Sequence, residues 1–264
     1  MNKIVLVSGA SSGIGFETAQ YLHALGYQVI GISRTYPKFE YGFDYFLCDI
    51  TDEDKVKEIK QLIEKKYGHI DVLLNSAGMG ISGAIENTPL EEVKHIYNIN
   101  VFGHFLVTKN ILPLLRLSKE PKIINISSVA SDIALPFQAF YSMTKASIDA
   151  FTKALAIEVK PFKIKVCAIL PGDIKTGFTK NRLQPYQVEN DLYTERAKRS
   201  LNRMAKDEEN GMHPKKIAKK IEKLIRKKRI PLRTTVGLSY KTIRVLNKLL
   251  PEKFVQFFVR KLYG

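Results

Sequence analysis

The chain has 264 residues, of which 45% are hydrophobic and 26% are charged, so it can bury a large core and is too apolar for general disorder. No run approaches the roughly 20 apolar residues of a membrane span, and the apolar N-terminal run is too short for a signal peptide, so we expect a cytoplasmic protein. The net charge of +16 resides mainly in residues 212–264, where 16 Lys or Arg face two acids. The two cysteines, Cys48 and Cys167, lie in apolar strand-like runs and are interpreted as reduced core thiols.

Short Val- and Ile-rich runs alternate along the chain with longer segments of helical period. Strands are predicted at 3–8, 27–33, 44–50, 69–75, 122–127, 164–170 and 231–237. Helices are predicted at 14–26, 52–67, 89–117, 139–160 and 214–229. Such alternation predicts a Rossmann-like, doubly wound parallel α/β sheet with helices on both faces. We expect one domain over residues 1–237, with a loop at 34–43, a substrate lid at 171–211 and a basic amphipathic extension at 238–264.

A glycine-rich turn follows the first predicted strand directly. Glycines at 9, 13 and 15 allow a tight turn, and the backbone there can approach a pyrophosphate at the N-terminus of the next helix. Because the turn stands between a buried strand and an amphipathic helix, it predicts a dinucleotide site rather than a structural turn. The predicted contacts are Gly9, Ser11, Ser12, Gly13, Ile14 and Gly15.

The residues that end the second strand indicate which dinucleotide is bound. An acid that binds the ribose hydroxyls of NAD is expected there, but the sequence reads Ser33-Arg34-Thr35. A guanidinium binds the 2′-phosphate of NADP, whereas a carboxylate repels it. We therefore predict NADP(H) in preference to NAD(H), with Arg34 on the phosphate; the alternative is that Arg34 is a solvated loop residue.

Tyr141 and Lys145 are spaced to share one face of the helix predicted at 139–160. A free phenol titrates near pH 10, and a neighbouring cation is expected to lower that value toward the range useful in acid–base chemistry. Ser128 stands 13 residues before Tyr141, just after a predicted strand. Its hydroxyl could hydrogen-bond to a substrate oxygen on the ligand side of the sheet.

Taken together in order and spacing, these motifs resemble the short-chain dehydrogenase/reductase family, in its compact branch of about 250 residues. The resemblance extends from Lys3 to Thr176 and rests on Gly9-x-x-x-Gly13-x-Gly15, Asn75-Ser76-Ala77-Gly78, Asn100, Ser128, Tyr141 with Lys145, and Pro171-Gly172. Two positions depart from the family pattern: Ser8 replaces a threonine, and Ser76 replaces a second asparagine.

The resemblance implies a role for each matching residue. Tyr141 is the expected acid–base group, Ser128 orients the substrate, Lys145 binds the nicotinamide ribose, and Asn100 holds a water in a proton relay. Further cofactor contacts are expected from the ends of the third and fourth strands and from the loop after the sixth; they are Asp49, Ile50, Asn75, Ala77, Gly78, Pro171, Gly172, Ile174 and Thr176. The expected reaction interconverts a secondary alcohol and a ketone by hydride transfer, without a metal.

Apolar residues are predicted to form the substrate wall, which suggests a steroid-, retinoid- or acyl-like substrate by analogy with the family. They are Met79, Ile81, Ile133, Leu135, Phe137, Phe140 and Phe178. We also expect a homodimer or homotetramer, by the same analogy. The alternatives are a protein that senses NADP(H) without turnover and a membrane-surface protein on the same fold.

The basic C-terminal part allows several interpretations. Ile217, Ile221, Leu224 and Ile225 form an apolar stripe, which favours a helix packed on the sheet with its lysines in solvent. Residues 249–263 combine aromatic and basic side chains and could contact an anionic membrane surface, cover the substrate pocket or contact a partner subunit. Nucleic-acid binding is not expected, because no recognised nucleic-acid module accompanies the charge.

Overall fold

The structure is a computed structural model that describes residues 3–184 and 192–264. Residues 1–2 at the start of the predicted domain, and 185–191 of the predicted lid, lie outside the described residues. All strands of the sheet are parallel and follow the order β3-β2-β1-β4-β5-β6-β7. They are β1 (Ile4–Ser8), β2 (Gln28–Ser33), β3 (Asp44–Leu47), β4 (Val72–Asn75), β5 (Lys122–Ile126), β6 (Lys165–Leu170) and β7 (Arg233–Thr235).

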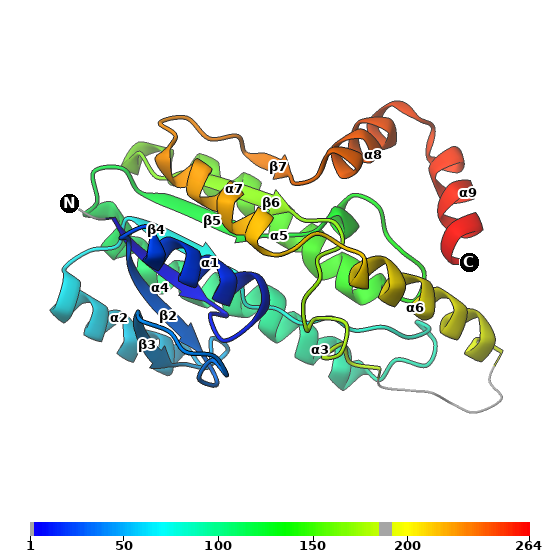
Figure 1. Ribbon diagram of the computed structural model, residues 1–264, viewed down its shortest axis with the longest axis horizontal. Coiled ribbons are helices and arrows are strands. Elements are labelled where there is room, and N and C mark those ends of the chain that lie inside the picture. Colours follow the sequence, from blue (N-terminus) through cyan, green and yellow to red (C-terminus); the bar gives the residue numbers. More distant parts are fainter. Residues whose placement is uncertain (1–2, 185–191) are drawn as a thin grey trace.

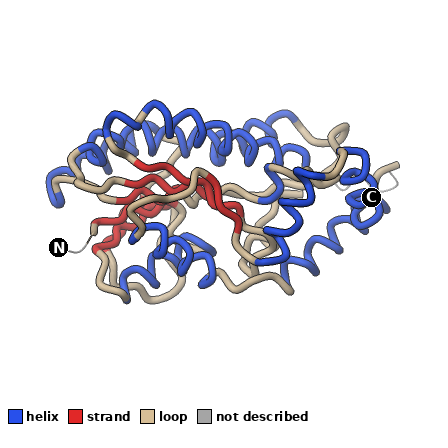
Figure 2. The backbone as a smooth tube through the Cα atoms, turned by 90° about the horizontal axis from the view of Figure 1, so that it is seen from above, coloured by secondary structure: helices blue, strands red, loops and turns tan. Residues whose placement is uncertain are grey.

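Helices cover both faces of this sheet, as Figure 2 shows with the strands in the middle layer. They are α1 (Gly13–Ala24), α2 (Glu53–Tyr67), α3 (Leu90–Tyr97), α4 (His104–Arg116), α5 (Ala139–Glu158), α6 (Thr194–Glu209), α7 (Lys215–Arg226), α8 (Leu238–Leu249) and α9 (Glu252–Tyr263). Three short helical turns are η1 (Asn98–Gly103), η2 (Val129–Ser131) and η3 (Lys160–Phe162). The predicted doubly wound sheet is confirmed, as is the loop at 34–43.

Two hydrophobic cores hold the layers together, one on each face of the sheet. The first joins α2, α4 and α5 to the sheet, through residues such as Ile63 and Leu114. The second joins α1 and α7, the pair at the front of Figure 1. Ile217, Ile221, Leu224 and Ile225 are all buried there. The expected packing of this basic helix on the sheet is therefore confirmed, and its lysines account for much of the net charge.

Two segments differ from the sequence-based expectation. The helix predicted at 89–117 is interrupted by η1, a π-helical turn in which the backbone hydrogen bonds shift by one residue. No helix was predicted in the lid at 171–211, but it contains α6, which buries Ser200 and Met204 one turn apart. Arg, Lys, Glu and Ala dominate α6, and these residues favour helices. Their propensity could have predicted this helix, whereas the pattern of apolar residues alone did not.

The last two helices extend from the end of the sheet where the strands have their carboxyl ends. After β7 the chain enters α8 and then α9, which stand away from the sheet in Figure 1. α9 contacts α6, so the part of the lid that the structure describes and the C-terminal extension meet. No helix among the described residues is both long and apolar enough to cross a membrane.

Candidate active site

One continuous cavity of about 1250 Å³ runs along the carboxyl ends of the central strands. Nearly all residues predicted for the site line it, although they come from distant parts of the chain. They are Gly9, Ser11, Ser12, Gly13, Ile14, Gly15, Arg34, Asp49, Ile50, Ala77, Gly78, Ser128, Tyr141, Lys145, Pro171, Gly172, Ile174 and Thr176. Asn75 and Asn100 are not part of the lining.

The turn after β1 is packed so tightly that only glycine fits at two of its positions. A Cβ atom on Gly15 would lie 2.2 Å from the Gly9 carbonyl oxygen. Gly9 itself has a positive φ of 71°, and a Cβ there would lie 2.6 Å from Cα of Ala77. The buried Ser8 hydroxyl ties the same two segments together, because it accepts hydrogen bonds from the Ser76 and Ala77 amides at 3.2 and 3.4 Å.

The N-terminus of α1 faces the cavity with its amides available. Ser12 is the N-cap residue, and its side chain makes no capping hydrogen bond within the described part of the chain. By contrast, Asp52 caps α2 by accepting from the amides of Asp54 and Lys55 at 3.0 and 3.1 Å. Uncapped amides at a helix N-terminus attract an anion. The glycine cradle and this helix end therefore fit the pyrophosphate of a dinucleotide.

Arg34 stands at the rim of the cavity, just beyond β2, and its side chain is exposed. The backbone beside it is held in place, since the Thr35 carbonyl accepts from the Ser33 hydroxyl at 2.7 Å and from the Tyr45 hydroxyl at 3.0 Å. The exposed Arg34 side chain therefore starts from a fixed backbone at this end of the cavity.

Asp49 and Ile50, which were expected to contact the cofactor, line the cavity beyond β3. One carboxylate oxygen of Asp49 accepts from both the amide and the hydroxyl of Thr51, at 2.9 and 2.8 Å, which fixes the aspartate side chain. Ile50 packs against Gly103, where an added Cβ would lie 2.5 Å from it. The two residues are therefore rigid parts of the wall.

Asn75 does not face the cavity, contrary to expectation. It is fully buried, and its amide group donates to Thr108 Oγ1 at 2.9 Å and to Asn125 Oδ1 at 3.0 Å. Asn125 in turn donates to Thr152 Oγ1 at 2.9 Å. Because buried amides need partners, this chain of hydrogen bonds joins β4 and β5 to α4 and α5 behind the cavity. The role of Asn75 is to hold the strand ends in place.

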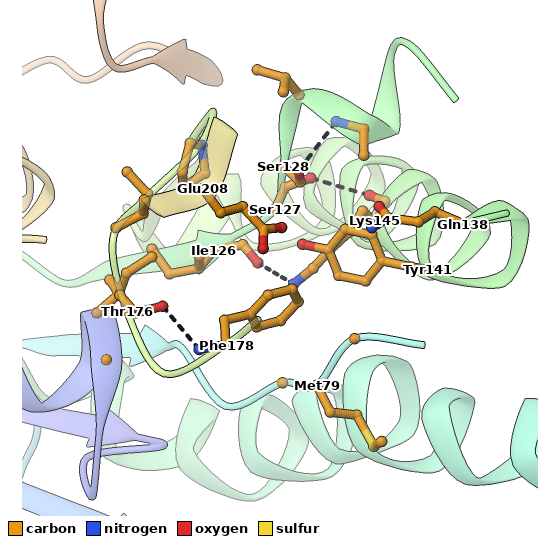
Figure 3. A pocket seen from close by; sticks show the side chains of 18 of the residues that line it. Met79, Ile126, Ser127, Ser128, Gln138, Tyr141, Lys145, Thr176, Phe178 and Glu208 are labelled. Carbon is orange, nitrogen blue, oxygen red and sulfur yellow. Dashed lines mark hydrogen bonds between the residues drawn. The ribbon is translucent and has the colours of Figure 1, made fainter. Parts of the chain in front are cut away.

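Tyr141, Lys145 and Ser128 meet in the middle of the cavity (Figure 3). Tyr141 and Lys145 are one turn apart in the first turns of α5, and the Lys145 Nζ lies 5.7 Å from the centroid of the tyrosine ring. Lys145 also donates to the Ile126 carbonyl at the end of β5, at 3.0 Å. Ser128 follows the same strand and lies beside Tyr141, and its side chain accepts from the Ala130 amide at 3.1 Å. The predicted catalytic group is thus assembled around the tyrosine hydroxyl.

Burial dominates the electrostatics of this group. It raises the pKa of Tyr141 to about 12, although the neighbouring Ser128 hydroxyl acts in the opposite direction. Burial also lowers the pKa of Lys145 to about 8. The expectation that Lys145 brings the tyrosine pKa down is therefore not met by the chain itself. At neutral pH the phenol therefore keeps its proton, whereas an efficient proton donor has a pKa near the operating pH.

Asn100 lies behind this group and is not part of the cavity lining, and its expected role in a water-mediated proton relay stays a prediction. It lies in η1 and is fully buried. Its side chain accepts from the Met79 amide and donates to the Met79 carbonyl, both at 2.9 Å, and also donates to Thr144 Oγ1 at 3.1 Å. A Cβ on Gly78 would lie 3.2 Å from Asn100 Oδ1 and 3.6 Å from Lys145 Nζ. Asn100 is therefore a neighbour of the catalytic lysine that fixes the loop after β4.

The loop after β6 closes the cavity opposite the glycine turn. The Val129 amide donates to the Pro171 carbonyl at 3.0 Å, and the Lys175 amide donates to the Met212 carbonyl at 3.0 Å. Thr176 Oγ1 accepts from the Phe178 amide at 3.2 Å (Figure 3). The loop is thus tied to η2 at one end and to the segment before α7 at the other.

The apolar wall next to Tyr141 is only partly the one expected. Met79, Ile133, Leu135 and Phe178 line the cavity, and the Phe178 ring lies 5.5 Å from that of Tyr141. Ile81, Phe137 and Phe140 are not in the lining. Ile81 is buried where its backbone bridges to Leu183, and the Phe137 carbonyl accepts from the Gly83 amide at 2.9 Å. These residues pack the surrounding structure.

Much of the apolar wall comes instead from α6, which lies in the predicted lid, and from α8 and α9 in the C-terminal extension, for whose last part a cover over the pocket was one interpretation. The residues are Met204 of α6, Ile243 and Leu246 of α8, Leu250, and Val255, Phe258, Val259 and Leu262 of α9. We call α8 and α9 together the roof. The sequence shows the spacing of the apolar residues within 238–264, but it does not show which surface these residues pack against.

Several polar contacts attach the roof to the body of the protein, including one from Asn247 to the Asp132 carbonyl at 3.3 Å. Tyr240 Oη donates to Asp173 at 2.5 Å, and its ring lies directly over Gly172, where a Cβ would be 2.3 Å away. Arg244 Nε donates to Asp132 at 3.0 Å, and Tyr263 Oη donates to Asp207 on α6 at 3.0 Å. Of the interpretations left open for the extension, the structure supports the one in which it covers the substrate pocket.

The glycine cradle, the uncapped helix end and the buried Tyr–Lys–Ser group define a dinucleotide-dependent oxidoreductase. In agreement, residues 3–187 match the family model described as short chain dehydrogenase. The chain belongs to the short-chain dehydrogenase/reductase family, whose members are NAD(P)-dependent oxidoreductases that act on CH–OH groups.

The chain is similar in sequence and in structure to several proteins of this family. The chain is 40% identical to 3-ketodihydrosphingosine reductase of Bacteroides thetaiotaomicron over 99% of this chain and 98% of that protein. Among solved structures, a short-chain dehydrogenase of Streptomyces avermitilis matches with a TM-score of 0.81 and 30% identity, over 94% of each chain. The 3-ketoacyl-(acyl-carrier-protein) reductase of Brucella melitensis, complexed with NADH, matches with a TM-score of 0.75 and 25% identity, over 89% of this chain and 96% of that one.

Proposed function

We propose that this protein is an NADPH-dependent reductase of a ketone carried on a long aliphatic chain. The observation that carries the proposal is the continuity of the cavity: it leads from the glycine cradle past Tyr141 into the apolar chamber under the roof. A chamber walled by Ile, Leu, Val, Met and Phe gains free energy by removing a hydrocarbon chain from water, at about 25 cal/mol per Å². A short polar ketone buries less apolar surface and would gain less binding free energy there.

The reaction follows from where the side chains stand. A bound nicotinamide supplies the hydride. Ser128 and Tyr141 would both hydrogen-bond the substrate oxygen, and Tyr141 would give it a proton as negative charge develops there. Lys145, held by the Ile126 carbonyl, provides positive charge close to the phenolate that remains. Asn100 keeps the loop at Met79 and Gly78 against this group.

NADPH is proposed over NADH because of the residue at the end of β2. Arg34 is exposed at the rim of the cavity, and the sequence provides no carboxylate at the neighbouring positions 33 and 35. A guanidinium there pairs with a 2′-phosphate through charge-assisted hydrogen bonds.

The relative from Bacteroides thetaiotaomicron, named for a ketone of a sphingoid lipid, supports a lipid ketone as the first substrate to try. The test follows the loss of NADPH absorbance with 3-ketodihydrosphingosine and with a series of methyl ketones of increasing chain length. We expect kcat/KM to rise by roughly 2- to 4-fold per methylene until the chamber is filled, which corresponds to about 0.8 kcal/mol per buried CH₂. A flat series, or a maximum at the shortest ketone, would refute a chain-binding chamber.

A ketosteroid and retinal belong in the same assay, because the cavity volume alone admits compact substrates. Turnover of a ketosteroid at a rate above that of the long-chain ketones would assign the chamber to a rigid ring system instead. Binding of NADPH without turnover of any compound would favour the sensing protein that the sequence left as an alternative.

A further inference from the structure

The roof has a second apolar surface that faces away from the cavity. Five residues of α8 and α9 are absent from the cavity lining and are between 49% and 81% exposed: Leu238, Val245, Leu249, Phe254 and Phe257. We call them the outer patch. On each helix they recur at helical spacing beside the stripe that lines the cavity. Neither helix contains a buried residue, whereas α7, of the same length, buries six.

The charges around the outer patch are almost all of one sign. Residues 238–264 contain six Lys or Arg and a single acid, Glu252. Arg244 is engaged with Asp132 in the body of the protein. The other five basic residues are exposed, and they alternate with the outer patch along both helices; they are Lys241, Lys248, Lys253, Arg260 and Lys261.

We propose that the outer patch and its basic residues dock on the surface of an anionic lipid bilayer. Helices that lie in a membrane interface combine an apolar face of Leu and Phe with flanking Lys and Arg, as these two do. The apolar side chains enter the boundary of the acyl chains, and the basic side chains attract the anionic headgroups. This docking goes beyond the reductase activity proposed above and does not require it.

A second copy of the chain fits the outer patch less well. A two-fold contact places the same surface of both copies face to face, so it would bring the same basic residues together. Like charges at close range oppose such a contact, whereas an anionic bilayer complements them.

The outer patch also continues into the cavity. Leu250 and Phe258 line the cavity and are still 38% and 53% exposed, so the apolar surface runs without a break from the outside of the roof to its inside. Docking would therefore place the open edge of the substrate chamber at the depth where the chains of membrane lipids begin. A lipid ketone could pass between bilayer and cavity with little exposure to water.

The experiment is vesicle flotation of the full chain. Vesicles of phosphatidylcholine alone are compared with vesicles that also contain phosphatidylglycerol, at low and at high salt. We expect at least about 10-fold more protein to float with the anionic vesicles, and most of this difference to disappear at high salt. Absence of flotation, or equal flotation with neutral vesicles, would overturn the proposal.

Two matched variants locate the contact. The triple variant Leu249→Glu, Phe254→Glu and Phe257→Glu should lose flotation. Its control, Leu25→Glu, Leu62→Glu and Leu90→Glu, changes three exposed apolar residues of the main body in the same way and should float like the unchanged chain. Thermal unfolding shows that each variant is folded. Equal loss in both variants would overturn the proposal.

Sedimentation of the same proteins tests the alternative that a second copy of the chain covers the outer patch. If the unchanged chain self-associates, the outer-patch variant does not, and neither floats, then a second copy covers the patch and the bilayer proposal is wrong. Failure of every ketone in the turnover assay would count against the reductase while leaving the flotation result intact.

Discussion

The nucleotide end of the cavity is held by backbone, whereas the substrate end is held by side chains. At the first end, Gly9 and Gly15 pack against main-chain atoms of the sheet and of each other, with no room for a methyl group. At the second end, the roof is attached by Tyr240, Arg244 and Tyr263 and contains no buried residue. Backbone packing at the nucleotide end leaves no room for another side chain, whereas the roof depends on side-chain contacts between segments far apart in the chain.

The largest expected effect lies where the two ends meet, at Tyr141. Tyr141→Phe removes the proton donor while keeping the ring that packs against Phe178. We expect kcat to fall by about 10²- to 10⁴-fold, with NADPH affinity unchanged, measured by steady-state kinetics and by a binding titration. Retention of more than about a tenth of kcat would show that another group donates the proton.

The next prediction tests whether a change at the nucleotide end affects the binding of NADPH without affecting the binding of the ketone. Arg34→Ala should raise the KM for NADPH by about 10- to 100-fold, because a charge-assisted hydrogen bond is worth about 1.5–3 kcal/mol. The KM for NADH and for the ketone should change little. Arg229→Ala removes an exposed arginine far along the chain and serves as the control. Equal increases for both nucleotides would remove Arg34 from the phosphate site.

His104, which is buried behind the cavity, predicts how the stability of the fold depends on pH. It is fully buried, and its Nε2 is 2.6 Å from the Ala77 carbonyl. Burial, with a smaller contribution from Lys145, lowers its pKa to about 4 from the ordinary 6.5. Below pH 6.5 the unfolded chain takes up a proton that the folded chain refuses, so stability is lost as the pH falls toward 4.

Between pH 7 and pH 5 this one histidine should cost about 2 kcal/mol of unfolding free energy. The measurement is urea denaturation at the two pH values. In His104→Asn the difference between the two pH values should shrink by about that amount, even if the variant is less stable at both. An unchanged difference would assign the acid sensitivity to other groups.

The smallest expected effect tests the substrate end. Tyr240→Phe removes one attachment of the roof and leaves Asp173 without that donor. We expect the KM for a long-chain ketone to rise about 3- to 10-fold, in line with the roughly 1 kcal/mol that a typical hydrogen bond contributes. The KM for a short ketone should not change. Tyr21→Phe is the control; a rise for short and long ketones alike would place Tyr240 in the reaction centre.

Sequence reasoning succeeded where local chemistry decides the structure. The glycine turn, the strand ends and the spacing from Ser128 to Tyr141 and Lys145 needed no knowledge of distant contacts. Prediction failed where tertiary partners decide. The amide of Asn75 is polar enough for a binding site, but its place in a buried strand directs it to Thr108 and Asn125. The pKa of Tyr141 likewise depends on burial, which the i, i+4 spacing does not show.

The roof shows the same limit. Its apolar and basic pattern was evident, but the contacts of Tyr240, Arg244 and Tyr263 join segments that are 67, 112 and 56 residues apart along the chain. Nothing in the local sequence near Tyr240 identifies Asp173 as its acceptor. Phe137 and Phe140 were wrongly assigned to the cavity wall for a similar reason. Their apolar character indicates burial, but it does not identify the residues that they pack against.

The bond between Tyr240 and Asp173 has a consequence for the binding of the two ligands. Asp173 belongs to the loop of Pro171 and Thr176, at the nicotinamide side of the cavity, while Tyr240 belongs to the roof. A ligand that holds this loop also holds the first turn of α8, so the two binding events share a free energy of coupling. Thermodynamic reciprocity then requires that any change the nucleotide makes to the affinity for the ketone is matched by the same factor in the affinity for the nucleotide when the ketone is bound.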